Sequence, residues 1–270
     1  MPIALQSFKI FFGITKGLYS QFNFFLTNSI SSFPKGLPCE VSFPDLFGDP
    51  NPIIVLHAIC HNPTGVDLDQ SQWQKLADLF TENNNLLPFL DCAYQGFARS
   101  LDDDIYAVRL LQQRKLNFIL AYSFSKNMGL YRDRIGALSI YSTDASKTSA
   151  ITSQIQITAR RCYSSPPAHG AEVISKILNS QELNSLWRSE LDAAKQRILN
   201  LRQLIANKIP QFSFVTNQNG MFSMLGLDKE QIMQLRTDYG IYIVGNSRIN
   251  IAGLNPNNID YFCNAIQAVK

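Results

Sequence analysis

From residue 50 onward, apolar and polar positions follow the two periods of regular secondary structure. Residues 52–60, PIIVLHAIC, form a short apolar run rich in β-branched side chains, which is typical of a buried strand. In the following segment, SQWQKLADLF, apolar residues recur with helical spacing at Trp73, Leu76, Ala77 and Phe80. We expect an amphipathic helix there, with an aspartate or serine as its N-cap.

The alternation continues along the chain. Strand patterns occupy residues 86–94, 116–125 and 134–142, and a helical pattern occupies residues 106–113. Strands that alternate with helices predict an α/β fold, with a mostly parallel sheet flanked by helices.

After Pro166-Pro167 the pattern changes. Residues 180–209 predict one long helix with a row of apolar side chains on one side: Leu183, Leu186, Trp187, Leu191, Ile198, Leu201 and Ile205. The strand candidates that follow are short: FSFV at 212–215, GMFSML at 220–225, IYIV at 241–244 and RINIA at 248–252. They predict a smaller C-terminal α+β domain.

Two helices accompany these short strands. One is expected between a capping Asp228 and Gly240, and the other from Asn255 as N-cap with Pro256 in the first helical position. We therefore divide the chain into a divergent N-terminal segment 1–49, a large α/β domain 50–192 and a small domain 193–270.

Composition excludes several classes of function. A net charge of +3 over 270 residues gives no basic stripe for nucleic acid, and no apolar run has the length of a membrane span. The five cysteines form no CxxC pair, which indicates a reduced, cytoplasmic compartment. Residues 1–39 contain lysines but no acidic residue and no arginine, so they match a mitochondrial targeting peptide only in part.

Polar residues cluster where three predicted strands end. The first strand is followed by His57, His61 and Asn62, the second carries Asp91 and Tyr94, and the third carries Ser123, Ser125 and Lys126. Ligands of open α/β sheets bind beyond the carboxyl ends of the strands. A lysine, an acid and hydroxyls there suit pyridoxal 5'-phosphate, which needs a lysine for a Schiff base and an acid for its ring nitrogen.

A metal site is the less favoured interpretation of these residues. His57 and His61 are four residues apart on a strand, which separates them widely, and no cluster of carboxylates accompanies them. We expect no metal. Each polar residue taken singly also has an ordinary interpretation, since Lys126 can be a solvated surface lysine and Asp91 a helix cap or turn residue.

Six motifs in order resemble the aspartate aminotransferase family, the fold-type I group of pyridoxal-phosphate-dependent aminotransferases. The resemblance covers roughly residues 50–270, and the motifs are HNPTG (61–65), DCAYQGF (91–97), SFSKNMGLYRDRIG (123–136), YSSPPAHGA (163–171), NGMFS (219–223) and RINIAGLN (248–255). The family's roles can be carried over to these positions.

The resemblance implies that Lys126 carries the cofactor as a Schiff base and moves the substrate's Cα proton, while Asp91 pairs with the ring nitrogen. Tyr94 and Asn62 would hydrogen-bond the phenolic oxygen of the cofactor. The phosphate would be held by Ser123, Ser125 and Arg134. Arginine suits that position because its planar fork binds an anion with two hydrogen bonds.

The implied substrates are amino acids and 2-oxoacids. Arg248 would bind the α-carboxylate, and Phe222 would line the substrate pocket. Arg160, or Arg161 beside it, matches the arginine that binds a distal carboxylate from the neighbouring subunit. The resemblance thus implies a homodimer that transfers an amino group between aspartate, or a related amino acid, and 2-oxoglutarate; an aromatic amino acid is the other possible substrate.

The resemblance stops short of the N-terminus. Family members carry further strands there, a Ser-Gly-Thr/Ala turn for the phosphate, a tryptophan that stacks on the cofactor and a tyrosine that reaches the partner's phosphate. No such turn precedes residue 50, the first tryptophan is Trp73, and Tyr19 lacks the matching context. We expect an N-terminally truncated or divergent family member with an incomplete sheet. The alternative function is a catalytically impaired fragment that acts at most as an interaction partner.

Overall fold

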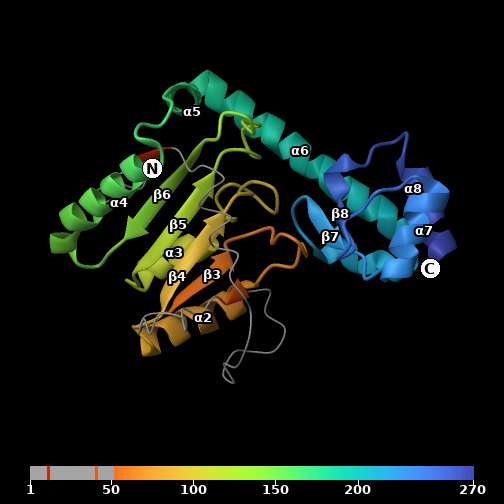
Figure 1. The fold of residues 1–270 in the computed structure, drawn as a ribbon, viewed down its shortest axis with the longest axis horizontal. Coiled ribbons are helices and arrows are strands. Elements are labelled where there is room, and N and C mark those ends of the chain that lie inside the picture. Colours follow the sequence, from red (N-terminus) through yellow and green to blue (C-terminus); the bar gives the residue numbers. More distant parts are fainter. Residues whose placement is uncertain (1–10, 13–39, 42–51) are drawn as a thin grey trace. The chain divides into compact units, whose positions relative to one another are not determined.

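The computed structural model describes residues 11–12, 40–41 and 52–270 (Figure 1). The predicted N-terminal segment 1–49, with the candidate targeting stretch 1–39 and Tyr19, lies outside the described residues except for two short strands. The chain divides into two compact units. Unit 1 contains the described residues up to Ala58, Leu68–Ala93 and Ile105–Arg188, and unit 2 contains Ile59–Asp67, Tyr94–Asp104 and Ser189–Lys270.

Unit 1 is built on a six-stranded sheet in the order β1-β6-β5-β4-β3-β2 (Figure 1). Its strands are β1 (Phe11–Phe12), β2 (Glu40–Val41), β3 (Ile53–His57), β4 (Leu87–Cys92), β5 (Phe118–Ser123) and β6 (Gly136–Tyr141). The pairs β3–β4 and β4–β5 are parallel, and β6 lies antiparallel to β5. The expected α/β fold is confirmed. The expectation of a mostly parallel sheet is wrong, since β1–β6, β2–β3 and β5–β6 are antiparallel and the sheet is mixed. The short connection from β5 to β6 reverses the chain direction there.

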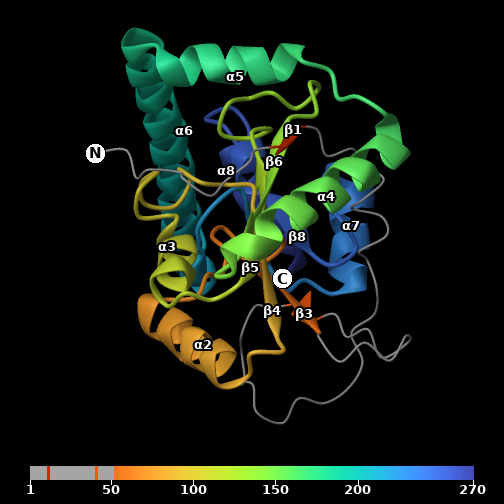
Figure 2. The same ribbon diagram turned by 90° about the vertical axis from the view of Figure 1, so that its left-hand side faces the viewer.

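The main core of unit 1 lies between the sheet and two helices, α2 (Gln70–Glu82) and α3 (Tyr106–Gln113), which are side by side in Figure 2. Alternate residues of β3, Ile54 and Leu56, point into this core, as the period of a strand requires. The predicted helical row of α2 is confirmed, since all four of its members are buried. Asp69 caps α2 through a capping box with Gln72.

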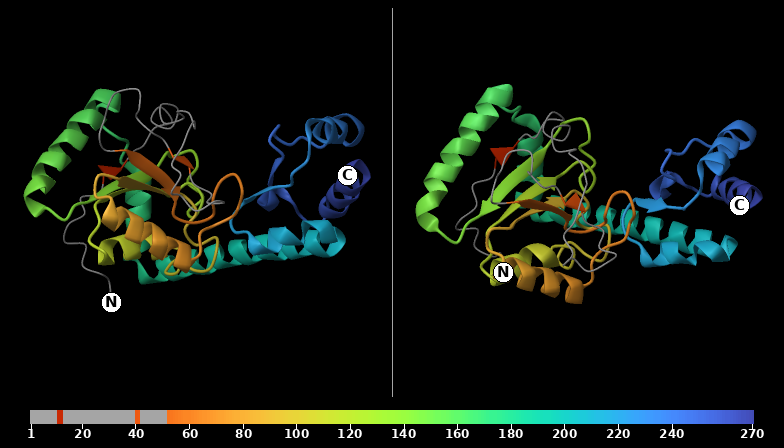
Figure 3. Two further views of the ribbon diagram at one scale, coloured as in Figure 1. Left: turned by 90° about the horizontal axis from the view of Figure 1, so that it is seen from below. Right: turned by 60° about the horizontal axis from the view of Figure 1, so that its bottom comes forward.

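Helices follow β6 for the rest of unit 1. They are η1 (Ala145–Lys147), α4 (Thr148–Tyr163), α5 (His169–Asn179) and α6 (Gln181–Lys208), whose C-terminal part belongs to unit 2. Figure 3 shows α6 as one continuous helix, which confirms the long helix predicted from residue 180. Its predicted apolar row is buried from Leu191 onward, whereas Leu186 is exposed.

Unit 2 contains a two-stranded antiparallel sheet of β7 (Phe222–Met224) and β8 (Arg248–Asn250). Its helices beyond α6 are η2 (Pro210–Asn217), α7 (Lys229–Tyr239), η3 (Ile251–Gly253) and α8 (Ile259–Val269). The predicted α7 is confirmed at both ends, because Asp228 caps it and Gly240 ends it with a φ of 61°. A left-handed φ of this kind favours glycine.

Three expectations for unit 2 were wrong. Residues 212–215 belong to the helix η2, since Phe212 and Val215 are buried three positions apart, as on one side of a 3₁₀ helix. Residues 241–244 form no strand, because no described strand lies beside them to complete a ladder. Helix α8 begins at Ile259 instead of Pro256, since Asn255 first forms a turn in which its side chain accepts from the backbone N–H of Asn257.

Among the described residues, every helix is too short or too polar to cross a lipid bilayer.

Candidate active site

The first part of the candidate site lies in unit 1, at the ends of the parallel strands. Asp91 lies near the end of β4, paired with His57 of β3 and Ala121 of β5. Its backbone carbonyl accepts a hydrogen bond from Ala58 N–H at 2.8 Å. The sheet therefore fixes the backbone of Asp91 on both sides and presents a half-buried carboxylate where β3 and β4 end.

Lys126 lies in the turn that follows β5, between two anchored neighbours. Ser125 is buried, and its N–H donates to Ser123 Oγ at 3.2 Å. Asn127 is also buried; its side-chain amide donates to the Tyr122 hydroxyl at 2.7 Å. The indole N–H of Trp187 donates to the Asn127 carbonyl oxygen, also at 2.7 Å. These contacts hold the backbone on either side of Lys126, so the position of its Cα is fixed.

The electrostatic surroundings of Lys126 favour a neutral amine. Burial lowers the pKa of Lys126 below its ordinary value of 10.5, and it is the largest cause of the shift. The Asp91 carboxylate acts in the opposite direction and raises this pKa, while the Arg134 guanidinium lowers it. A lysine whose pKa is lowered has more of the unprotonated form that attacks carbonyl carbons and accepts protons.

The predicted phosphate ligands lie around the same turn. Ser123 ends β5, Ser125 is one residue before Lys126, and Arg134 comes just before β6 with a φ of 55°. The exposed Arg134 side chain donates one hydrogen bond to the Tyr131 carbonyl oxygen at 2.8 Å. Two hydroxyls and a guanidinium can donate hydrogen bonds to a phosphate, and a half-buried amine can attack an aldehyde carbon, so these residues fit a phosphorylated aldehyde.

The second part of the candidate site lies in unit 2, where four predicted residues come together. Arg248 Nη1 donates to Asn62 Oδ1 at 2.7 Å. The Arg248 guanidinium lies over the Phe222 ring, 4.5 Å from its centroid. Tyr94 meets the same ring edge-on at 6.3 Å and is only 4% exposed. The amide and the ring together restrict the guanidinium of Arg248, which leaves a fork oriented for a carboxylate.

The loop that carries Asn62 is fixed by its neighbours. Asp67 accepts the backbone N–H of His61 at 2.9 Å, and Gly65 N–H donates to the His61 carbonyl at 2.7 Å. Gly65 has a φ of 71°, and a Cβ added there would meet the Phe222 carbonyl oxygen at 2.5 Å. Only glycine meets both conditions. The His61 ring bonds Thr64 Oγ1 at 2.7 Å, and the described residues contain no cluster of metal-ligating side chains.

A buried carboxylate that the sequence analysis missed fixes the loop after Tyr94. Asp104 is 1% exposed and accepts the backbone N–H groups of Gly96, Ala98 and Arg99 at 2.8–3.1 Å. Burial raises the pKa of Asp104 above 3.8, while the three hydrogen bonds act to lower it. No motif marks this residue, because its partners are backbone groups that any residue type supplies.

Arg160 belongs to α4, a different element from those that carry the other candidates of unit 1. It occupies the last turn of α4, a helix without any buried residue, and is exposed, as is Arg161. Within the described residues, no hydrogen bond or ion pair joins Arg160 to another predicted site residue. Since its expected role requires a neighbouring subunit, that role stays a prediction.

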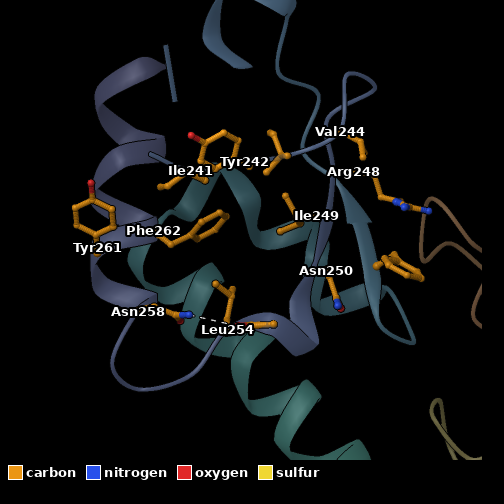
Figure 4. A pocket seen from close by; sticks show the side chains of 13 residues that line it. Ile241, Tyr242, Val244, Arg248, Ile249, Asn250, Leu254, Asn258, Tyr261 and Phe262 are labelled. Atoms are coloured by element: carbon orange, nitrogen blue, oxygen red, sulfur yellow. Dashed lines mark hydrogen bonds between the residues drawn. The ribbon is translucent and has the colours of Figure 1, made fainter. Parts of the chain in front are cut away.

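A pocket of about 420 Å³ adjoins Arg248 in unit 2. Figure 4 shows Arg248 at one border of the pocket, and Tyr261 and Phe262 of α8 at the opposite border. The irregular segment 241–244 supplies part of the lining, with Tyr242 exposed. The Arg248 side chain therefore lies at the boundary between an apolar hollow and the polar Asn62 loop.

The fold and these residues define an α/β protein built like the pyridoxal-phosphate-dependent aminotransferases, with a lysine of lowered pKa after a central parallel strand. The chain belongs to the aminotransferase class I and II family, whose model matches residues 45–266. It is 43% identical over 223 residues to the aspartate aminotransferase of Escherichia coli K12, a match that covers 80% of this chain and 56% of that protein.

Other proteins similar to this chain are also aminotransferases. The cytoplasmic aspartate aminotransferase of Dictyostelium discoideum is 44% identical over 240 residues, which is 86% of this chain and 55% of that protein. The crystal structure of the aromatic-amino-acid aminotransferase of Burkholderia pseudomallei, covalently bound to pyridoxal phosphate, superposes with a TM-score of 0.79 at 42% identity. That match covers 82% of this chain and 57% of the Burkholderia chain. The chain thus spans about half the length of the relatives it matches.

Proposed function

We propose that this chain is an aminotransferase that moves an amino group from aspartate, or a related amino acid, to 2-oxoglutarate. One observation carries the proposal: Lys126 lies between the buried residues Ser125 and Asn127, and burial lowers its pKa although the charge of Asp91 raises it. The identity to aspartate aminotransferases supports it. We do not favour the alternative of an inert fragment, since all six motifs, with Lys126, Asp91 and Arg248 in them, are present in order.

The cofactor in this proposal is pyridoxal 5'-phosphate, as in the Burkholderia relative. Lys126 would bind its aldehyde carbon, and Asp91 would pair with its ring nitrogen. Ser123, Ser125 and Arg134 would bind its phosphate, and Asn62 and Tyr94 its phenolic oxygen. When bound, the cofactor supplies an electron-poor ring that takes up the electrons left behind when the substrate's Cα loses its proton.

The chain's own contribution is to position groups and to move a proton. Nζ of Lys126 would accept the proton from Cα and return a proton to another atom, and a lowered pKa increases the share of the neutral amine that can accept it. The fixed carboxylate of Asp91 favours a positive charge beside it.

Substrate binding is assigned to Arg248, with Phe222 and Asn62 beside it. The guanidinium fork would bind the α-carboxylate of either substrate with two hydrogen bonds. We assign the distal carboxylate to Arg160 of a second copy of the chain, which makes the working form a homodimer. A cytoplasmic location and the division into a cofactor domain, 50–192, and a small domain, 193–270, are parts of the same proposal.

An absorption spectrum of the purified chain with pyridoxal phosphate tests this proposal. We expect a band that is lost in Lys126→Ala and retained in Lys147→Ala, an exposed lysine on η1. Addition of aspartate should change the band, and addition of 2-oxoglutarate should restore it as oxaloacetate and glutamate form. A folded chain whose spectrum is the same in wild type and Lys126→Ala would refute the assignment.

Arg248→Lys tests the substrate assignment separately. Lysine keeps the positive charge but loses the fork, so we expect a KM for aspartate at least tenfold higher, with the cofactor band unchanged. An unchanged KM would remove Arg248 from the substrate site without affecting the role of Lys126.

A further inference from the structure

Unit 2 contains a buried cation that the proposed chemistry does not use. Arg202 of α6 is 1% exposed, although long charged side chains are rarely buried without an ionic partner. Its guanidinium donates to six neutral acceptors in one stretch of chain: the carbonyl oxygens of Val215, Asn219, Gly220 and Phe222, Gln218 Oε1 and Ser223 Oγ. Gln218, Asn219 and Gly220 lie between η2 and β7, and Phe222 and Ser223 are the first two residues of β7. We call residues 218–223 the 218–223 turn.

Burial lowers the pKa of Arg202 to about 10, with Cys60 and Asp67 acting in the opposite direction. The side chain is therefore charged at neutral pH, and its desolvation is offset by hydrogen bonds to backbone carbonyls. An apolar side chain of similar volume would avoid this desolvation, but it would leave the buried acceptors without a donor. Arginine also fixes the orientation of the backbone, since its planar guanidinium donates to several carbonyl groups at once.

The turn that Arg202 fixes carries part of the candidate substrate site. The Phe222 carbonyl accepts from Arg202 Nη2 at 2.8 Å, and the Phe222 ring lies beneath the Arg248 guanidinium. Phe222 also begins β7, which pairs with β8 in the register that places Phe222 opposite Asn250. Arg202 thus contacts the backbone of the residue on which the guanidinium of Arg248 rests.

The same turn is fastened to the loop that carries Asn62. Asn219 N–H donates to the Gly65 carbonyl at 2.8 Å, and its side-chain amide donates to Asp67 Oδ2 at 2.9 Å. Gly220 has a φ of 73° and packs so closely on Cys60 that a Cβ would lie 2.5 Å from that residue's Cβ. Both neighbours of Arg248, the Phe222 ring and the Asn62 amide, therefore depend on the turn that Arg202 holds.

We propose that Arg202 is a positioning residue for carboxylate binding: by fixing the 218–223 turn it sets the orientation of the Arg248 guanidinium through Phe222 and Asn62. Arg202 touches neither substrate nor cofactor in this role. The inference rests on the proposed function only for the identity of the ligand. The orientation of Arg248 is a property of the chain alone.

The test combines one measurement without ligand and one with succinate, a dicarboxylate that cannot be transaminated. The first is the side-chain Nε–H resonance of Arg248 in a ¹⁵N spectrum. The second is the dissociation constant of succinate, measured by titration calorimetry on the chain loaded with pyridoxal phosphate. The variants are Arg202→Met, Arg202→Lys and the milder Ser223→Ala, which removes one acceptor at 2.7 Å.

We expect Arg202→Met and Arg202→Lys to shift or broaden the Arg248 resonance and to weaken succinate binding at least tenfold, and Ser223→Ala to weaken it about threefold. The matched control is Arg197→Met, on the same helix. Arg197 donates to the Leu254 and Ala252 carbonyls instead. In Arg197→Met the Arg248 resonance should therefore be unchanged, and the dissociation constant of succinate should stay within twofold of wild type. Combined with Arg248→Lys, Arg202→Lys should add little further loss, whereas a purely structural role would give additive losses.

The possible outcomes separate this inference from the proposed function. If the wild type does not bind succinate but the Arg248 resonance responds to Arg202→Lys, the positioning role stands and the substrate assignment fails. If a folded Arg202→Lys or Ser223→Ala variant leaves both measurements at wild-type values, the inference is overturned. If Arg202→Met does not fold, the results for Arg202→Lys and Ser223→Ala decide the inference.

Discussion

The close approach of Gly220 to Cys60 gives a sharp prediction for the stability of unit 2. Gly220→Ala adds a Cβ at a φ of 73°, 2.5 Å from Cys60 Cβ and 3.1 Å from its Sγ. A left-handed conformation costs a residue with a Cβ about 1–2 kcal/mol. Overpacking adds about 1–3 kcal/mol when the neighbour cannot move away. We expect the free energy of unfolding of unit 2 to fall by about 2–5 kcal/mol.

Gly226 provides the matched control. Its φ is 68°, but a Cβ there would have no atom within 4 Å. Gly226→Ala should therefore cost only the conformational part, about 1 kcal/mol after the smaller entropy of the unfolded alanine chain is included. Urea unfolding followed by far-UV circular dichroism measures both losses, and hydrogen exchange of unit 2 amides shows where they act.

A second substitution separates the packing part from the conformational part. Cys60 itself has a φ of 57°, so Cys60→Gly removes the colliding Cβ at a position whose backbone suits glycine. In that background Gly220→Ala should cost no more than Gly226→Ala, which gives a coupling energy of about 1–3 kcal/mol. Equal costs at Gly220 and Gly226, or a coupling near zero, would refute the reasoning.

Three further predictions concern other buried or anchored groups. The amine of Lys126 should react with an acylating reagent with a midpoint below pH 10.5, and Asp91→Asn should lower that midpoint further, because the carboxylate raises the pKa; a higher midpoint would contradict this. Asp104→Ala leaves three N–H groups without an acceptor and should destabilise unit 2 by about 3 kcal/mol or more in urea unfolding, whereas Glu190→Ala, at an exposed position of α6, should have little effect. Trp187→Phe removes the donor to the Asn127 carbonyl and should cost about 1 kcal/mol in thermal unfolding; an unchanged unfolding temperature would contradict this.

Elements with local signals could be predicted from the sequence. Helices α2 and α7 were expected because a capping aspartate, an apolar row and, for α7, a terminal glycine all lie within a dozen residues. The segment at 241–244 was misjudged because an apolar, β-branched run becomes a strand only beside a partner. The segment at 212–215 was misjudged because four residues do not distinguish a period of two from a period of three.

Some residues of the candidate site could be predicted from the sequence pattern, and others could not. Asp91 and Lys126 could be predicted together, since parallel strands bring their ends to one edge of a sheet. The pair of Asn62 and Arg248 is 186 residues apart and was expected only from the resemblance to a family. Arg202 and Asp104 were missed because they bind backbone groups, and a backbone carbonyl or N–H leaves no trace in the sequence of its partner.

The discontinuous make-up of unit 2 has a consequence for synthesis on the ribosome. Asn219 is translated 152 residues after Asp67, its hydrogen-bond partner, and at about 5–20 residues per second the delay is roughly 8–30 s. During that time the segments Ile59–Asp67 and Tyr94–Asp104 have emerged without the helix and turn against which they are ordered. The hydrogen bond between Asn62 and Arg248 can therefore form only late in translation, after residue 248 has been made.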